Sequence, residues 1–226
     1  MRKEPAIRLR ITYEKIDALR FISHRDLIQV LTRALRRAHV PLAYTQGFSP
    51  RPKLSFAPPL PLGVKGAGEL LDIELTRHQD EEDFILMANK AVPQGLRFID
   101  ATNLLAGAPG LSSLISRCRY RFRPLSEKLG DSCAQELLTK KSIIITKQRK
   151  KDKVPKEVEV RNLLHSLTEE EDGAIVAEVT ATPQTISPFA MAKLLWPALE
   201  NHALDDLDIT RLGFLTVSGK ELFKGN

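Results

Sequence analysis

The chain has 226 residues, of which 42% are hydrophobic and 27% charged, a composition typical of a folded globular protein. Lys and Arg total 34 against 28 Asp and Glu, and the net charge of +6 favours anionic partners without indicating a fold. The two cysteines, Cys118 and Cys133, are too few for a Cys-rich metal site or an iron–sulfur cluster, so this chain is not itself an iron–sulfur radical enzyme.

The first hundred residues predict three structured stretches. Alternating apolar and polar residues predict a strand from Ile7 to Tyr13, which continues in β-rich residues from Ala18 to Ile22. A capping box from Ser23 to Asp26, followed by leucines at helical spacing, predicts a helix that stops at Pro41. After a Pro- and Gly-rich stretch, the patterns predict two strands, a helix and a strand, over 53–56, 69–75, 80–91 and 96–101. The element order is therefore βαββαβ.

The second half repeats this order after a turn-rich segment. Residues 104–116 lack periodicity and predict a linker. Strand patterns over 118–123, 142–146, 174–180 and 207–217 then alternate with helical patterns over 126–138 and 188–199. We predict an α+β fold of two tandem ferredoxin-like (βαββαβ) units with antiparallel sheets, each with helices on one sheet face. The predicted parts are an N-terminal unit with a Gly/Pro-rich loop (1–103), the linker (104–116) and a C-terminal unit (117–226).

The sequence also bears on the compartment. The N-terminal residues run directly into a charged alternating strand, so we expect no signal peptide and a cytoplasmic protein with reduced thiols. The longest uncharged run, from Ala101 to Ser116, is interrupted by two glycines and a proline and is too short to span a bilayer. We expect no membrane contact.

Positive charge is concentrated in two windows. Residues 20–53 carry +6 and residues 147–156 carry +5, which leaves −5 for the rest of the chain. In the first window Arg33, Arg36 and Arg37 lie on the helix side away from its leucines, and guanidinium groups bind phosphate bidentately. A solvated helix face is the alternative. The second window, with Lys150 and Lys151, is a tip between two strands, where a solubilising hairpin is the alternative to nucleic-acid contact.

The segment 44–53 has the most unusual chemistry in the chain. It lacks the Gly-Lys-Ser/Thr end of a P-loop, and its prolines remove backbone donors that such a loop uses. The prolines favour an extended shape that holds Arg51 and Lys53 beside two aromatic side chains, Tyr44 and Phe48, with Gly47 between them. These aromatic groups suit stacking on bases, and core packing is the alternative for both. Long connections of this composition are typical of functional loops.

Catalytic patterns are weak. Ser23, His24 and Asp26 are too close in sequence for a triad, because neighbouring residues at a helix start point in different directions. We expect His24 to be structural, with a general base as the alternative. We expect Asp72 and Glu74 to face solvent or pair with arginines. The histidines show no metal-ligand spacing, so we predict no metal site and no cofactor.

Several motifs together resemble a known family. The chain is similar to the bacterial radical SAM-linked (radical SAM-associated) proteins, a domain family of unknown function, and the likeness extends through nearly the whole sequence. The motifs that carry it are FISHRDL (21–27), ALRRA (34–38), QGFSPRPK (46–53), PLPLGV (59–64), KEVEVR (156–161) and LDITR (207–211).

The resemblance implies an RNA or translation context, because family members occur alone or fused behind a radical SAM module and are commonly encoded near an E/G-type ribonuclease and ribosomal proteins. A chain without cluster-binding cysteines would be the stand-alone form, which presents a substrate to a radical SAM protein. The alternatives are an RNA-processing or RNA-modifying enzyme that uses His24 with the arginine cluster, and a protein-only adaptor. The expected nucleic-acid or anion-binding residues are Arg25, Arg33, Arg36, Arg37, Tyr44, Gly47, Phe48, Arg51, Lys53, Lys150 and Lys151.

Overall fold

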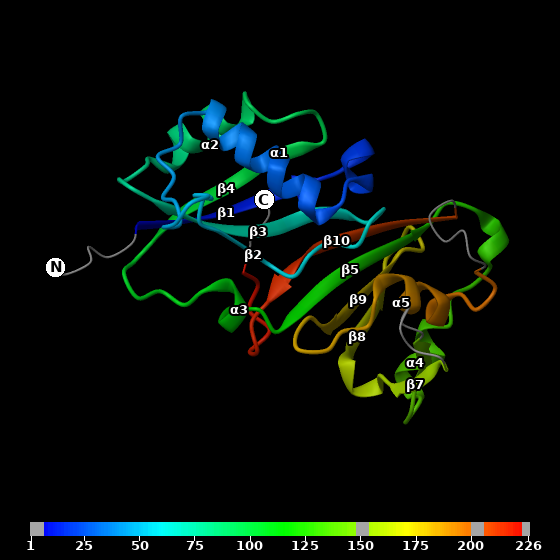
Figure 1. The fold of residues 1–226 in the computed structure, drawn as a ribbon. Helices are drawn as coiled ribbons and strands as arrows, with labels where there is room; N and C mark the ends of the chain where they lie inside the picture. Colours follow the sequence, from blue (N-terminus) through cyan, green and yellow to red (C-terminus); the bar gives the residue numbers. More distant parts are fainter. Residues whose placement is uncertain (1–6, 148–153, 200–205, 223–226) are drawn as a thin grey trace.

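The fold is built on one large sheet that runs through both halves of the chain (Figure 1). A computed structural model describes residues 7–147, 154–199 and 206–222. The strand order is β4-β1-β3-β10-β5-β9-β8, and the short β2 pairs with β3 outside this path. All pairings within each half are antiparallel, which confirms an α+β fold with a mainly antiparallel sheet.

In the N-terminal half, helices pack on strands as the sequence pattern predicts. The Ser23 hydroxyl accepts a hydrogen bond from the Asp26 amide and donates one to the Asp26 carboxylate, so the cap forms without the predicted return bond to the Ser23 amide. Behind this cap, the leucines of α1 are buried against the sheet. The elements of this half are β1 (Ile7–Lys15), the 3₁₀ turn η1 (Asp17–Phe21), α1 (His24–Arg37), β2 (Leu54–Phe56), β3 (Lys65–Leu75), α2 (Glu81–Asn89) and β4 (Leu96–Leu104).

One predicted extension of the first strand is wrong. Residues 18–21 belong to η1 rather than to a strand, because Asp17 adopts a left-handed conformation (φ 50°) two residues after β1 ends. The Ile16 amide donates to the Gly95 carbonyl at 2.8 Å, which fixes this reversal against the start of β4. The chain thereby turns back over the sheet and brings Ser23 to the start of α1.

The C-terminal half differs more from prediction. The strand predicted over 142–146 is β6, which pairs with β7 in a separate two-stranded sheet. In the large sheet, β8 occupies the position that was expected for the strand 142–146. The sequence missed β8 because its residues are polar and mostly exposed. The predicted helix 126–138 is reduced to η2 and α4. The elements are α3 (Leu111–Leu114), β5 (Arg117–Pro124), η2 (Glu127–Leu129), α4 (Ala134–Thr139), β6 (Ile144–Lys147), β7 (Lys156–Glu159), η3 (Arg161–Leu163), β8 (Leu164–Glu169), β9 (Ile175–Thr180), α5 (Pro188–Leu195) and β10 (Leu207–Leu215).

The expectation that each half has a sheet of its own is wrong. β10 pairs with β5 on one side and, in parallel, with β3 on the other, at Thr210–Lys65 and Arg211–Gly66. Ion pairs reinforce this junction, because Lys65 Nζ lies 2.9 Å from the Asp208 carboxylate across it. A parallel pairing this short leaves no pattern in the sequence. The division into two units at 104–116 stays a prediction, and the linker region itself contains the short helix α3.

The helices are distributed over both ends of the sheet. Figure 1 shows α1 and α2 over the β4-β1-β3 part, and α4 and α5 beside β8 and β9. Two hydrophobic cores correspond to these two groups of helices. Among the described residues, no helix combines the length and apolar character needed to cross a membrane.

Candidate functional site

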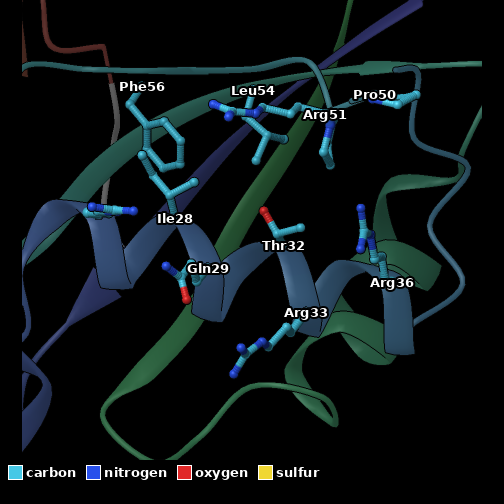
Figure 2. A pocket seen from close by; sticks show the side chains of 11 residues that line it. Ile28, Gln29, Thr32, Arg33, Arg36, Pro50, Arg51, Leu54 and Phe56 are labelled. Atoms are coloured by element: carbon cyan, nitrogen blue, oxygen red, sulfur yellow. The ribbon is translucent and has the colours of Figure 1, made fainter. Parts of the chain in front are cut away.

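A groove of about 550 Å³ lies between α1 and the segment from Pro50 to Phe56 (Figure 2). We call it the arginine groove. Its apolar lining consists of aliphatic, proline and aromatic side chains, and none of the described lining residues carries a carboxylate. The lining residues are Arg25, Ile28, Gln29, Thr32, Arg33, Arg36, Pro50, Arg51, Pro52, Leu54 and Phe56. The groove is therefore cationic and apolar at the same time.

Helix α1 forms one wall because it has two chemically different faces. Leu27, Leu31 and Leu35 are buried in the core. The groove residues of α1 recur at spacings of three and four, which places them on a single, separate face. Figure 2 shows Thr32 and Arg36 directed toward the opposite segment. The same figure shows Arg33 directed away from that segment, so the two arginines differ in direction although both line the groove.

The opposite wall is a loop closed by its own backbone. The Thr45 amide donates to the Arg51 carbonyl at 2.8 Å, and the Arg51 amide donates to the Thr45 hydroxyl at 3.0 Å. Gly47 has a φ of 122°, which a residue with a side chain adopts only with strain. Phe48, next to it, is fully exposed (110%), so the alternative of core packing is wrong for Phe48. The loop holds Arg51 at the groove and Phe48 at its tip.

Tyr44 fixes the position of one groove arginine. Arg36 Nε donates to the Tyr44 hydroxyl at 3.1 Å, and the guanidinium carbon lies 5.5 Å from the centre of the tyrosine ring. Tyr44 is 36% exposed and so is not a core residue. Tyr44 holds Arg36 in position through this contact, and the remaining N–H donors of the guanidinium are free to bind an anion.

The groove does not include every residue that the sequence suggested. Arg37 points the other way and donates to the Ala91 carbonyl at 2.8 Å. Lys53 forms an ion pair with Glu74 at 2.6 Å, so the partner of this acid is a lysine rather than an arginine. Asp72 pairs with Arg10 at 2.7 Å, as expected. Lys150 and Lys151 lie outside the described residues.

A second, smaller cavity lies next to the groove, and sequence reasoning missed it. Polar side chains from three elements line it: Tyr13 and Lys15 of β1, His24 of α1, and Glu69 of β3. Phe56 lines both the cavity and the groove. Its ring and the His24 ring are nearly perpendicular, with their centres 5.2 Å apart. The free volume is about 10 Å³, room for one water-sized atom. We call it the β1 cavity.

One signal in the sequence pointed to this cavity. Alternation in β1 places Tyr13 and Lys15 on the same side as Leu9 and Ile11, which are fully buried. Lys15 is accordingly only 1% exposed. A lysine in phase with the apolar residues of a strand is an unusual position, because burying an ammonium group is costly. Such a lysine indicates a built polar site rather than a solvated edge.

Electrostatics in the β1 cavity disfavour additional positive charge. Burial lowers the pKa of Lys15, with Glu69 acting against this shift and Arg211 adding to it. Burial and the nearby Lys15 lower the pKa of His24, so its ring is neutral at pH 7. Burial raises the pKa of Tyr13, whose hydroxyl therefore keeps its proton. The cavity thus offers one ammonium and one hydroxyl donor beside a neutral imidazole.

Comparison with known proteins assigns the chain to a family. The model of a family described as an uncharacterized protein conserved in bacteria, DUF2344, matches residues 8–188. This span includes both walls of the arginine groove and all four polar residues of the β1 cavity. No curated protein matches the sequence. The chain therefore belongs to the bacterial family DUF2344.

Proposed function

We propose that the protein binds single-stranded RNA in the arginine groove and acts as an accessory protein that presents the bound strand to a partner enzyme. The observation that carries the proposal is a groove with four arginines, apolar walls and no carboxylate among its described lining residues. Arginines bind backbone phosphates, while apolar and aromatic groups contact bases that only an unpaired strand exposes. The fully exposed Phe48 adds a stacking surface at the loop tip.

The partner in this proposal is a radical SAM enzyme. Its support is the resemblance of motifs such as FISHRDL and QGFSPRPK to the radical SAM-linked proteins. Both motifs contribute residues to the groove: Arg25 comes from the first, and Arg51 comes from the second. In this proposal the protein acts in the cytoplasm, together with the RNA that it binds.

We also infer that the two halves are ferredoxin-like units that share one sheet. The strand order is β4-β1-β3-β2 in the first half and β10-β5-β9-β8 in the second. In both halves the fourth strand of the unit lies beside the first, followed by the third and the second, which is the ferredoxin-like order. In each half one helix follows the first strand and another precedes the last. β10, the edge strand of the second unit, then joins the two units by pairing in parallel with Lys65 and Gly66, a part of β3 that β2 does not cover.

An enzyme is the second candidate, favoured by the position of His24. This residue lines the β1 cavity and directly precedes Arg25, which lines the groove. A neutral imidazole at the end of an RNA-binding groove is suited to general base chemistry. If the protein cleaves RNA in this way, His24→Ala lowers the cleavage rate by roughly 10²–10⁴-fold. A binding protein shows no cleavage to lose.

Salt-dependent binding tests the main proposal with two neighbouring variants. The affinity for a single-stranded RNA and for a duplex of the same sequence is measured over a range of KCl concentrations. We expect tighter binding of the single strand, and Arg36→Ala should lower the log–log salt slope by about 0.7 per lost phosphate contact. Arg37→Ala is the matched control, since Arg37 is bound to the Ala91 carbonyl and lies outside the groove. Equal slopes in both folded variants would refute the assignment.

A further inference from the structure

The β1 cavity has a polar lining that the fold alone does not require. It shares Phe56 with the arginine groove, and Figure 2 shows Phe56 and Ile28 at one end of the groove. Loop residues Pro58, Pro59 and Leu60 close its other side. These belong to the PLPLGV region, a motif that the groove does not use.

The acid beside the cavity already has a partner. Glu69 accepts two hydrogen bonds from Arg211, at 2.8 Å to Nε and 2.5 Å to a terminal nitrogen. Arg211 is 2% exposed, donates to the Pro58 carbonyl at 2.8 Å, and lies 4.6 Å from the Phe214 ring. Since this bidentate pair neutralises the glutamate, the ammonium of Lys15 is left as an uncompensated buried charge.

Two donors in the cavity remain available. Lys15 Nζ donates to the Ile22 carbonyl at 3.1 Å, which uses one of its three protons. Tyr13 is 3% exposed and lines the cavity, and its hydroxyl makes no hydrogen bond to another described residue. The hydroxyl is not one of the fully buried polar atoms that lack a partner, so it borders the free space of the cavity and can donate to a ligand or water atom there. The atom that suits these two donors is an acceptor that also carries negative charge.

The position of α1 adds to this preference. The helix has 14 residues and begins at His24, so its positive N-terminal end lies at the cavity. The free volume admits a single oxygen-sized atom, and the rest of the anion would have to remain outside, toward the groove. An internal phosphodiester is flanked by sugar on both sides, whereas a terminal phosphate can insert one oxygen and leave the strand behind it.

We propose that the β1 cavity is an anion subsite that accepts one oxygen of a terminal phosphate through Tyr13 and Lys15, while the arginine groove holds the strand that carries this phosphate. The identity of the strand rests on the proposed function. The phosphate subsite does not, because inorganic phosphate or a mononucleotide offers the same oxygen.

The test compares short single-stranded RNAs of one sequence with a 5′-phosphate, a 3′-phosphate or hydroxyl groups at both ends. We expect one of the two phosphates to tighten binding by about tenfold, the effect of one or two hydrogen bonds to a charged group. Tyr13→Phe and Lys15→Met should remove this preference and leave the affinity for the hydroxyl-ended RNA unchanged. Lys90→Met, which removes an exposed lysine at the end of α2, is the charge-matched control and should keep the preference.

Each remaining outcome decides the question. No preference for either phosphate in the unmodified protein, or a preference that persists in Tyr13→Phe, overturns the proposal. Tyr13→Phe alone suffices if Lys15→Met fails to fold, because the lost hydroxyl makes no hydrogen bond to any residue that the structure describes. Titration with AMP and with adenosine separates the two proposals. Tighter binding of AMP that depends on Tyr13, without any RNA binding, supports the subsite and contradicts the proposed function.

Discussion

Two regions of the molecule are rich in arginine, yet they present opposite surfaces. In the arginine groove, none of the four arginines forms an ion pair with another described residue. On β5 every arginine is paired with carboxylates: Arg117 and Arg119 with Glu178, Arg119 also with Glu221, Arg121 with Glu170 and Asp172, and Arg123 with Asp208. The number of arginines therefore does not mark a binding surface, whereas the absence of nearby acids does.

The buried pair of Arg211 and Glu69 is the extreme of the paired class, and disrupting it should have the largest effect. Arg211→Met leaves Glu69 as an unpaired buried carboxylate, which should cost about 3–5 kcal/mol in the free energy of unfolding. Urea denaturation measures this loss. The double variant Arg211→Met with Glu69→Leu should recover much of it, because both charges are gone. A single variant as stable as the unmodified protein would contradict the structural role of the pair.

Removing two groove arginines should reduce RNA affinity and leave stability intact. Arg36→Ala with Arg51→Ala deletes two phosphate contacts from opposite walls, which corresponds to about 25-fold weaker binding near 0.1 M salt. Fluorescence anisotropy with a labelled single strand measures the change. The control is Arg77→Ala with Arg97→Ala, which removes two exposed arginines elsewhere. An equal loss in the control would mean that net charge, and not the groove, determines affinity.

An arginine of β5 should show the reverse pattern, with a smaller magnitude. Arg121 contacts Glu170 and Asp172 at 2.5 Å each, but these pairs are exposed, so Arg121→Ala should lower the free energy of unfolding by less than about 1 kcal/mol. RNA affinity should not fall, because Arg121 and the two acids it pairs with lie outside the groove. A loss of affinity comparable with that of the groove variant would erase the distinction between the two regions.

The sequence singled out the arginines and the loop that line the groove, but it did not indicate the cavity. The window 20–53 contains a single acid, so its arginines cannot be neutralised locally, and the helical spacing of Arg33 and Arg36 places both at the groove wall. The opposite direction of Arg37 depends on the approach of the α2 end, which a local pattern does not encode. The β1 cavity depends on Arg211, a residue 142 positions from Glu69 that reaches it through the β3–β10 contact. Contacts of this kind become visible only in the folded structure.

Two histidines near these regions have a lowered pKa, His24 in the β1 cavity and His165 on β8, and this gives the smallest predicted effect. Burial lowers the pKa of both, with Lys15 adding to the shift at His24 and Arg117 at His165, while a nearby glutamate opposes it in each case. The folded state therefore binds these protons more weakly than the unfolded state, and stability should decline as the pH falls through about 6.5. His24→Gln should remove part of this decline between pH 7.5 and 5.5, measured by urea denaturation at each pH, and His165→Gln should remove a similar part.

The same measurement with AMP connects this decline to the β1 cavity. Phosphate in the cavity would offset the charge of Lys15 and favour protonated His24. Adding AMP should therefore flatten the decline in the unmodified protein and in His165→Gln, but less in His24→Gln. A decline that is the same in all three proteins would show that neither imidazole senses the neighbouring cation.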